Sequence, residues 1–170
     1  MLPWFLGAAP GHKVRRSAVI RVGVISDTHG LLRPEAVHHL VGVAHIIHAG
    51  DIGTEDVLEE LRRIAPVSAI RGNVDTGDWA RNYRDTETVH LGGHEFYILH
   101  DLNELGSKPA PVSVDAVICG HSHRASVKTI DGVLYLNPGS AGPRRFKLPI
   151  TLATLDLDES GEIRPIVHTL

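Results

Sequence analysis

Residues 20–30, which read IRVGVISDTHG, carry the two signals on which the fold prediction rests. Residues 20–25 form a short run rich in β-branched and apolar side chains. Polar Asp27 and His29 follow this run almost at once. A short apolar run closed by a small or polar residue is typical of a buried strand. These residues therefore predict a strand that ends in two side chains able to bind a metal ion.

Similar runs recur along the chain. They predict strands at 20–25, 45–49, 67–70, 95–99, 116–119, 133–136 and 151–157. Apolar residues at helical spacing predict helices at 34–41 and 55–64, the second with Thr54 as its N-cap. Strands and helices alternate early and helices become scarce later. We therefore expect a layered α/β sandwich whose first strands are parallel and whose last strands pair as hairpins.

The length of 170 residues suits one domain, which we place at residues 20–170, after a loose N-terminal extension at 1–19. No apolar run is long enough to span a bilayer, so we expect a cytoplasmic protein without a membrane partner. The net charge of -3 argues against general binding to nucleic acid.

The only cysteine, Cys119, excludes an intrachain disulfide and a cysteine-rich zinc module, and we expect it to be inert core. Twelve histidines make histidine and carboxylate the expected ligands of any metal site.

Candidate metal ligands follow five of the predicted strands. In chain order they are Asp27 and His29, Asp51, Asn73, His100, and His121 with His123. In open sheets, chemistry collects beyond the carboxyl ends of strands. Glycine precedes three of these positions, at Gly50, Gly72 and Gly120, where the lack of a side chain leaves room beside an ion.

Each motif taken alone has a simpler explanation. Asp27 and His29 could be a helix cap beside a surface histidine, and Gly50-Asp51 could be an ordinary turn. Together, at one edge of the predicted sheet, they favour a metal site. Seven candidates exceed the three or four ligands of one zinc ion and suit two ions about 3.5–4 Å apart, with Asp51 as the natural bridge. We expect manganese, with zinc, iron and nickel as alternatives.

The order of these motifs resembles the calcineurin-like metallophosphoesterase superfamily, and in particular its compact YfcE-like phosphodiesterase branch, whose fold the retromer subunit Vps29 shares. The motifs are Asp27-x-His29, Gly50-Asp51, Gly72-Asn73-x-Asp75, His100, Gly120-His121-x-His123 and, later, Asn137-Pro138-Gly139-Ser140. The resemblance covers residues 22–157. It implies a four-layer α/β/β/α sandwich with two metal ions. It also implies the ligand sets Asp27, His29, Asp51 and His123 for one ion, and Asp51, Asn73, His100 and His121 for the other.

The activity implied is hydrolysis of a small-molecule phosphate ester by a hydroxide held between two metal ions, with nucleic acid possible only as a substrate. We expect Asn73 and His100 to touch phosphate as well as metal, and Asp75 to orient a ligand histidine. Two departures from the family stand out. At the position of Val74, many members carry a histidine that is proposed to protonate the leaving group. At the position of Asp101, the family often has a glycine. Loss of that acid favours diesters and aryl esters over alkyl monoesters.

Other interpretations stay open. A Vps29-like interaction scaffold would keep the fold and bind metal with little or no catalysis, and it predicts gaps in the ligand set. A His-x-His hydrolase on a TIM barrel would need about 250 residues. A nuclease would need a basic groove, for which Arg144, Arg145 and Lys147 are the only late cluster. A homo-oligomer is compatible with the sequence.

We expect His48 to be a packed core residue or to support the site, and residues 101–111 to form an exposed loop. The remaining histidines, His38, His39, His45, His90, His94 and His168, are expected on the surface or on a helix face.

Overall fold

The computed structural model describes residues 19–170, so the expected loose extension lies, apart from Val19, outside the described residues. Fourteen elements follow in chain order. They are β1 (Ile20–Ile25), α1 (Pro34–Leu40), β2 (His45–His48), α2 (Glu55–Arg62), β3 (Val67–Ala69), η1 (Asp78–Asn82), β4 (Thr86–Leu91), β5 (His94–Leu99), η2 (Leu102–Gly106), β6 (Ala116–Ile118), β7 (Ser126–Ile130), β8 (Val133–Asn137), β9 (Thr151–Leu157) and β10 (Ile163–Thr169). All seven predicted strands are present, but β4, β7 and β10 are not predicted by the sequence.

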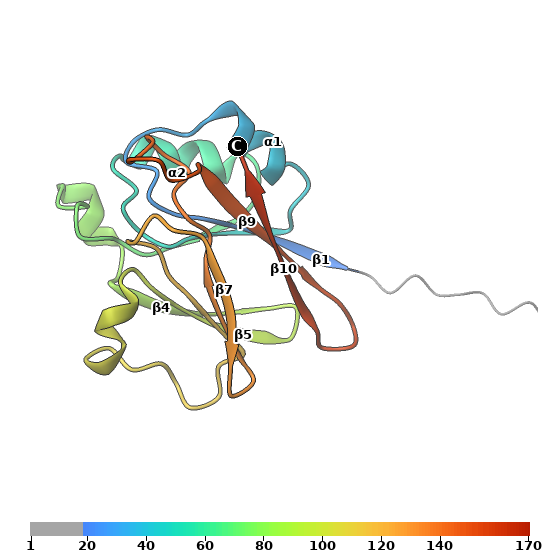
Figure 1. Ribbon diagram of the computed structural model, residues 1–170. Coiled ribbons are helices and arrows are strands. Elements are labelled where there is room, and N and C mark those ends of the chain that lie inside the picture. The colour runs from blue at the N-terminus through green and yellow to red at the C-terminus, as the bar shows by residue number, and fades with distance from the viewer. Residues whose placement is uncertain (1–18) are drawn as a thin grey trace, which may run out of the picture.

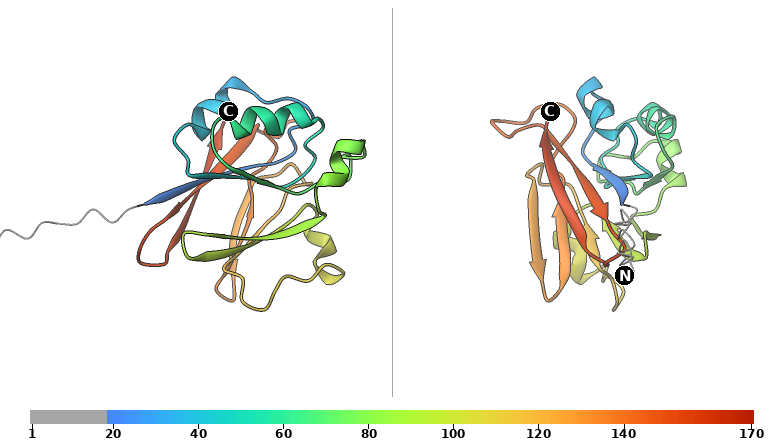
Figure 2. Two further views of the ribbon diagram at one scale, coloured as in Figure 1. Left: turned by 180° about the vertical axis from the view of Figure 1, so that it is seen from behind. Right: turned by 90° about the vertical axis from the view of Figure 1, so that its right-hand side faces the viewer.

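The strands form two five-stranded sheets, with orders β10-β9-β1-β2-β3 and β4-β5-β6-β8-β7. Strands β1, β2 and β3 are parallel, whereas β4 with β5, β7 with β8 and β9 with β10 pair as antiparallel hairpins. This confirms the expected parallel start and hairpin end. Helices α1 and α2 lie on the side of the first sheet that faces away from the second sheet (Figures 1 and 2).

Alternating side chains explain why the two sheets stack. In β2, Ile46 points into the cluster under the helices and its neighbour Ile47 points into the cluster between the sheets, and both are fully buried. Successive side chains of a strand project to opposite faces, so one strand can serve both cores. The result is the expected layered sandwich, with mixed sheets and few helices.

The outermost layer on the second sheet is thin. The sequence predicts only an exposed loop at 101–111, but the structure places the 3₁₀ helix η2 there. Leu105 and Ala110 pack on a cluster that includes Tyr97 and Cys119. This short segment covers part of that sheet face and leaves the rest open.

The two α-helices begin where the sequence predicts and end slightly earlier. Helix α2 ends at Arg62, with Arg63 as its C-cap, instead of at residue 64. One further turn of hydrogen bonds continues to Ala65, whose N–H donates to Leu61 O, and Pro66 has no N–H to extend it. Thr54 is the N-cap residue of α2, but its side chain makes no capping hydrogen bond. None of the described helices is long and apolar enough to cross a membrane.

Candidate metal centre

The loops that follow β1, β2, β5 and β6 meet at one edge of the sandwich. Backbone hydrogen bonds join them: Asp27 N–H donates to Gly50 O, and His29 N–H donates to Asp51 O, each at 3.0 Å. In the second sheet, Gly120 N–H donates to His100 O at 2.9 Å. The sheet edges thus bring together the predicted site residues, which are far apart in sequence.

Four of these residues form a compact cluster. Asp27, His29, Asp51 and His123 each place one ligand atom within 4.8 Å of all the others. His123 Nε2 lies 3.2 Å from Asp27 Oδ1 and 3.4 Å from His29 Nε2. His29 Nε2 lies 3.9 Å from Asp51 Oδ2. Two carboxylates and two imidazoles at these distances can converge on a single cation.

The remaining three predicted ligands adjoin this cluster through Asp51. His100 Nε2 lies 3.3 Å from Asp51 Oδ2. The His100 and His121 rings stack edge to face at 5.2 Å, and His121 Nδ1 lies 3.1 Å from Asn73 Oδ1. Asp51 therefore touches both groups of residues, which is the geometry required of a shared ligand.

Three buried polar atoms in this region have no hydrogen-bond partner among the described residues. They are Asp27 Oδ1, His100 Nε2 and His123 Nδ1. Buried polar groups are normally paired, because desolvation without a partner costs about 1–3 kcal/mol. Asp27 Oδ1 lies 3.2 Å from His123 Nε2, and His100 Nε2 lies 3.3 Å from Asp51 Oδ2. Two of the three unpaired atoms therefore lie among the candidate ligands, as expected of a site that holds metal ions.

The backbone at the site adopts an unusual conformation. Asp27, His29, Asp51, His121 and His123 have φ angles of +47° to +66°, and only Asp131 and Phe146 among the other described non-glycine residues share this left-handed region. Such residues cost free energy and cluster at functional sites, where the surrounding structure holds them in place. The sequence pattern locates these residues but does not indicate this strain.

The glycines before the ligands provide space. A Cβ on Gly72 would overlap the Asp51 carboxylate, and one on Gly120 would lie 2.8 Å from Asp27 Oδ2. A Cβ on Gly50 would lie 2.7 Å from His100 Nδ1, and only Gly50 of the three has a positive φ, at +92°. Space beside the candidate ligands is therefore the main reason for glycine at these three positions, as we expect from the sequence.

Charge at the centre is set by Asp51 and its neighbours. Burial raises the pKa of Asp51, but the nearby His100 ring, the hydrogen bond from Val74 N–H and the charge of His29 lower it to about 2. Burial lowers the pKa of His29, and nearby Arg145 lowers it further, against the opposing carboxylates Asp51 and Asp27. An ionised carboxylate and a neutral imidazole are the forms that bind metals.

Asp75 acts on backbone instead of on a histidine. Its carboxylate accepts hydrogen bonds from Ile52 N–H at 3.0 Å, and from Gly53 N–H and Gly72 N–H at 2.8 Å each. We expect from the sequence that it orients a ligand histidine. The structure shows instead that it ties the loop bearing Asp51 to the loop bearing Gly72.

His48 stabilises the loops that bear Asp27 and Asp51 through hydrogen bonds. Its Nδ1 accepts a hydrogen bond from Gly50 N–H, and its Nε2 lies 2.9 Å from Thr28 Oγ1. Because the Thr28 hydroxyl donates to Ile52 O, it must accept from His48, which fixes a neutral imidazole protonated at Nε2. Full burial agrees with this assignment, since it lowers the pKa of His48 to about 4.

Two residues of the Asn137-Pro138-Gly139-Ser140 motif, which is part of the family resemblance, also organise the site. Ser140 Oγ donates to Asp27 O at 3.0 Å, and Asn137 Nδ2 donates to Gly120 O at 2.6 Å. The Asn-Pro-Gly-Ser motif was the available signal, but its composition alone indicates only a turn.

Other side chains named in the sequence lie outside the cluster. Cys119 is buried, and burial raises the pKa of its thiol to about 12, so it is not a nucleophile. The basic residues Arg144, Arg145 and Lys147 are exposed. His94, expected on the surface, is instead buried, with Nδ1 3.6 Å from Asp115 Oδ2.

Comparison with protein families matches residues 20–160 to the calcineurin-like phosphoesterase superfamily domain. A probable metallophosphoesterase of Methanothermobacter thermautotrophicus is 35% identical over 159 residues, which cover 87% of this chain and 92% of that protein. A phosphodiesterase of Methanocaldococcus jannaschii is 28% identical, with 87% of this chain and 99% of that protein covered.

Solved structures share the fold. An archaeal phosphodiesterase superposes with a TM-score of 0.70 at 28% identity, covering 88% of this chain and 100% of the other. Vps29 from Entamoeba histolytica complexed with zinc superposes with a TM-score of 0.64 at 21% identity, covering 88% of this chain and 99% of that one. At the lower identity, the likeness to Vps29 concerns the fold.

Proposed function

Because the chain belongs to the calcineurin-like phosphoesterase superfamily, we propose that it is a phosphodiesterase that uses two divalent metal ions as its cofactor. A metallophosphoesterase with a candidate metal site of aspartates and histidines follows directly from the family and the cluster. We propose in addition the number of ions, the diester substrate and the role of each residue.

The observation that carries the proposal is the cluster of Asp27, His29, Asp51 and His123 within 4.8 Å, together with the unpaired Asp27 Oδ1 and His100 Nε2. The four residues of the cluster would hold one ion. Asp51, Asn73, His100 and His121 would hold the other. No ligand position of the pattern is replaced, so the gaps predicted by a scaffold function are not found among residues 19–170.

Divalent ions at such a site supply positive charge to the phosphoryl oxygens and lower the pKa of water. The residues of the chain position the substrate. Asn73 presents a neutral amide, which does not repel an anionic phosphate, and His100 is held by a 2.7 Å contact from Nδ1 to Ala49 O that leaves Nε2 facing the site. We assign both residues to phosphate contact as well as metal binding.

Val74 supports a diester or aryl ester as substrate. It stands where many family members carry a histidine, and it is 42% exposed. A valine cannot donate a proton, so esters whose leaving group departs without one are favoured. The similar protein from Methanocaldococcus jannaschii is named as a phosphodiesterase, which supports the same substrate class.

We propose manganese as the metal, with zinc, iron and nickel as alternatives. Mixed imidazole and carboxylate ligands are compatible with all four. The solved structure of the Vps29 relative, which shares this fold, is a complex with zinc, and this supports a divalent metal as the cofactor.

The test combines metal analysis with an assay. Purified protein is loaded with Mn²⁺, its bound metal is measured by mass spectrometry, and hydrolysis of bis(4-nitrophenyl) phosphate is followed. We expect about two ions per chain and turnover. Asp51→Asn should lose both, whereas Asp56→Asn, which removes an exposed carboxylate on α2, should keep both. Bound metal without turnover would favour the scaffold instead, and turnover unaffected by Asp51→Asn would refute the site assignment.

A further inference from the structure

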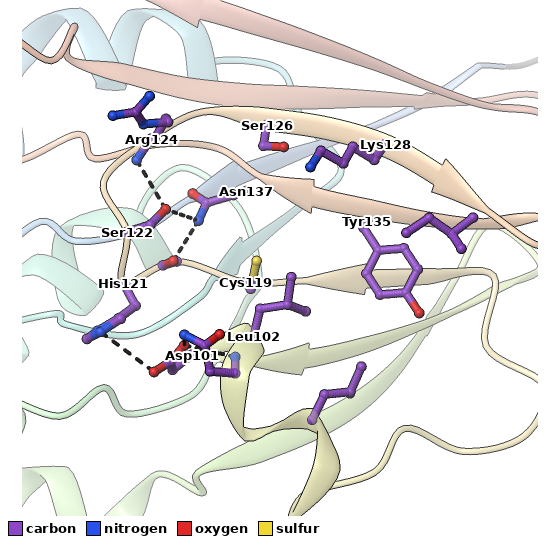
Figure 3. Close-up of a pocket in the computed structure, with 14 residues that line it drawn as sticks. Asp101, Leu102, Cys119, His121, Ser122, Arg124, Ser126, Lys128, Tyr135 and Asn137 are labelled. Atoms are coloured by element: carbon purple, nitrogen blue, oxygen red, sulfur yellow. Dashed lines mark hydrogen bonds and ion pairs between the residues drawn. The ribbon is translucent and has the colours of Figure 1, made fainter.

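A cavity of about 490 Å³ opens beside His121, on the outer face of the second sheet. Strands β7 and β8 form one wall, η2 forms the opposite wall, and the end of β6 provides the floor (Figure 3). Its size lies within the range of small-molecule binding pockets. Helix η2, at Leu102–Gly106, lines one side of the cavity.

The wall formed by β7 is built by strand periodicity. Arg124, Ser126, Lys128 and Ile130 alternate along the chain and all line the cavity. Ser126 and Lys128 pair with Asn137 and Tyr135 of β8, which line it as well. Since alternate residues of a strand share a face, Ser126, Lys128 and Ile130 form a regular row on β7, and Arg124 lies just before the strand.

The floor and opposite wall are mainly apolar. Leu102 faces the cavity and Cys119 lies at its base (Figure 3). Leu105, also of η2, lines the cavity as well. The ring of Tyr135 adds a flat aromatic surface. An apolar slot with an aromatic side suits a planar ring better than an extended polar chain.

The charge of the cavity is positive on one side. Neither Arg124 nor Lys128 forms an ion pair with any residue in the range 19–170. Asp101 is the one carboxylate among the lining residues, and its Oδ2 lies 3.6 Å from His121 Nε2. The Asp101 carboxylate therefore has His121 as its neighbour at the opening of the cavity. Arg124 and Lys128, the basic wall, remain available to a negatively charged ligand.

The cavity adjoins part of the candidate metal centre. His121 and Asp101 line it and also line a polar cavity of about 130 Å³ that includes Asn73 and His100. A phosphoryl group beside Asn73 would therefore have its ester group next to the larger cavity.

On the basis of the proposed function, we propose that this cavity binds the organic group of the phosphate ester and selects an aromatic ring that carries a further negative charge. The ring lies against Leu102, Leu105 and Tyr135. The charge lies toward Lys128 and Arg124. Substrate choice then depends on the β7 wall, which contributes nothing to the predicted metal ligands.

The experiment uses three phosphonates with a single organic group, so that only one group can enter the cavity. These are methylphosphonate, phenylphosphonate and 4-carboxyphenylphosphonate, each tested as an inhibitor of bis(4-nitrophenyl) phosphate hydrolysis. Phenylphosphonate should bind more tightly than methylphosphonate. The carboxylate should tighten binding by roughly a further fivefold, the size expected for one exposed charge pair.

Matched variants test the basic wall. Lys128→Glu should abolish the advantage of the carboxylate and leave the methyl compound unaffected. Thr129→Glu places the same charge at the next residue of β7, which lines a different cavity on the opposite face, and should change nothing. Equal inhibition constants for the three compounds, or equal effects of the two variants, would refute the proposal.

A second measurement does not depend on turnover. In zinc-loaded protein, 4-carboxyphenylphosphonate should shift the methyl NMR signals of Ile130, Leu102 and Leu105, whereas methylphosphonate should not. These shifts without hydrolysis of any ester would support the cavity and contradict the proposed phosphodiesterase. Hydrolysis with unmoved methyl signals would contradict the cavity alone.

Discussion

His123 Nε2 lies 3.2 Å from Asp27 Oδ1, and that oxygen accepts no hydrogen bond from any described residue. Asp27 follows β1 of the first sheet, and His123 follows β6 of the second sheet. The contact therefore joins the two halves of the sandwich through groups that lack their normal partners. A metal ion held between them would link the sheets directly.

We predict that metal binding stabilises the folded protein. At a free metal concentration about 100 times the dissociation constant, the gain is ~2.7 kcal/mol, which raises Tm by about 5–10 °C in a chain of this length. Differential scanning calorimetry with Mn²⁺ and with a chelator measures this difference. Asp27→Asn should remove most of the metal-dependent shift, whereas His38→Gln, on an exposed part of α1, should retain it. An equal shift in both variants would place the metal elsewhere.

A methyl group added at Gly72 should damage the site. The new Cβ would overlap the backbone N and the carboxylate of Asp51, so the loop must move at a cost of about 1–3 kcal/mol. We expect Gly72→Ala to lower both the unfolding free energy in urea and the metal affinity. Gly106→Ala is the matched control, because nothing lies within 4 Å of its added Cβ. Similar metal affinity in the two variants would show that the glycine does not provide the space for the centre.

The strands that the sequence does not predict share a position in the fold. Strands β4, β7 and β10 each lie at the edge of a sheet, where one side has no neighbouring strand. Their side chains are largely half-buried or exposed, as in β7, where four of five residues are exposed, and β10 contains Pro165. An edge strand needs no continuous apolar run, so the signal that predicts central strands is absent. The fourth edge strand, β3, is predicted because it leads into buried Ile70.

Asp75 should affect the centre by holding loops in place. Its carboxylate accepts three backbone hydrogen bonds, from Ile52, Gly53 and Gly72, and an asparagine has only one side-chain acceptor oxygen. We expect Asp75→Asn to weaken metal binding by about 10–100-fold, the usual effect of losing a supporting group. Isothermal titration with Mn²⁺ measures this change. Asp78→Asn, at a carboxylate exposed to solvent, should bind as the wild type does, and equal affinity of the two variants would contradict this role.

The lack of an acid at Val74 should be visible in the choice of leaving group. Rates across aryl and alkyl esters of graded leaving-group pKa should fall steeply as that pKa rises, because no side chain at this position supplies a proton. Val74→His should raise the rate for alkyl esters by up to about 10²-fold and flatten the dependence. Its backbone N–H already donates to Asp51 Oδ1, a bond that the substitution keeps. A flat dependence in the wild type, with chemistry shown to be rate-limiting, would contradict this interpretation.

The positions of the candidate ligands could be predicted from sequence, but their support could not. Each ligand follows a buried strand, so a one-dimensional pattern of apolar runs and polar ends is sufficient to place it at the sheet edge. The partners of Asp75 and His48 are backbone groups and a hydroxyl in other loops, and any residue type can offer a backbone N–H. Neither these contacts nor the cavity beside His121 can be inferred from a pattern of apolar and polar residues in the sequence.

The buried imidazole of His48 should make the fold sensitive to acid. Burial lowers its pKa from near 6.5 to about 4, against the opposing carboxylates Asp75, Asp27 and Asp51 and with a smaller lowering effect from His100. Between these two pH values the unfolded chain binds a proton that the folded chain does not, so stability is present above pH 6.5 and is lost as the pH falls toward 4. The loss is about 1.4 kcal/mol per pH unit in that window. Urea unfolding in chelator at pH 7 and pH 5 measures it, and His48→Gln should lose less stability than the wild type over this interval. Histidines shared by both proteins cancel in the comparison, so equal losses would show that His48 is not protonated on unfolding.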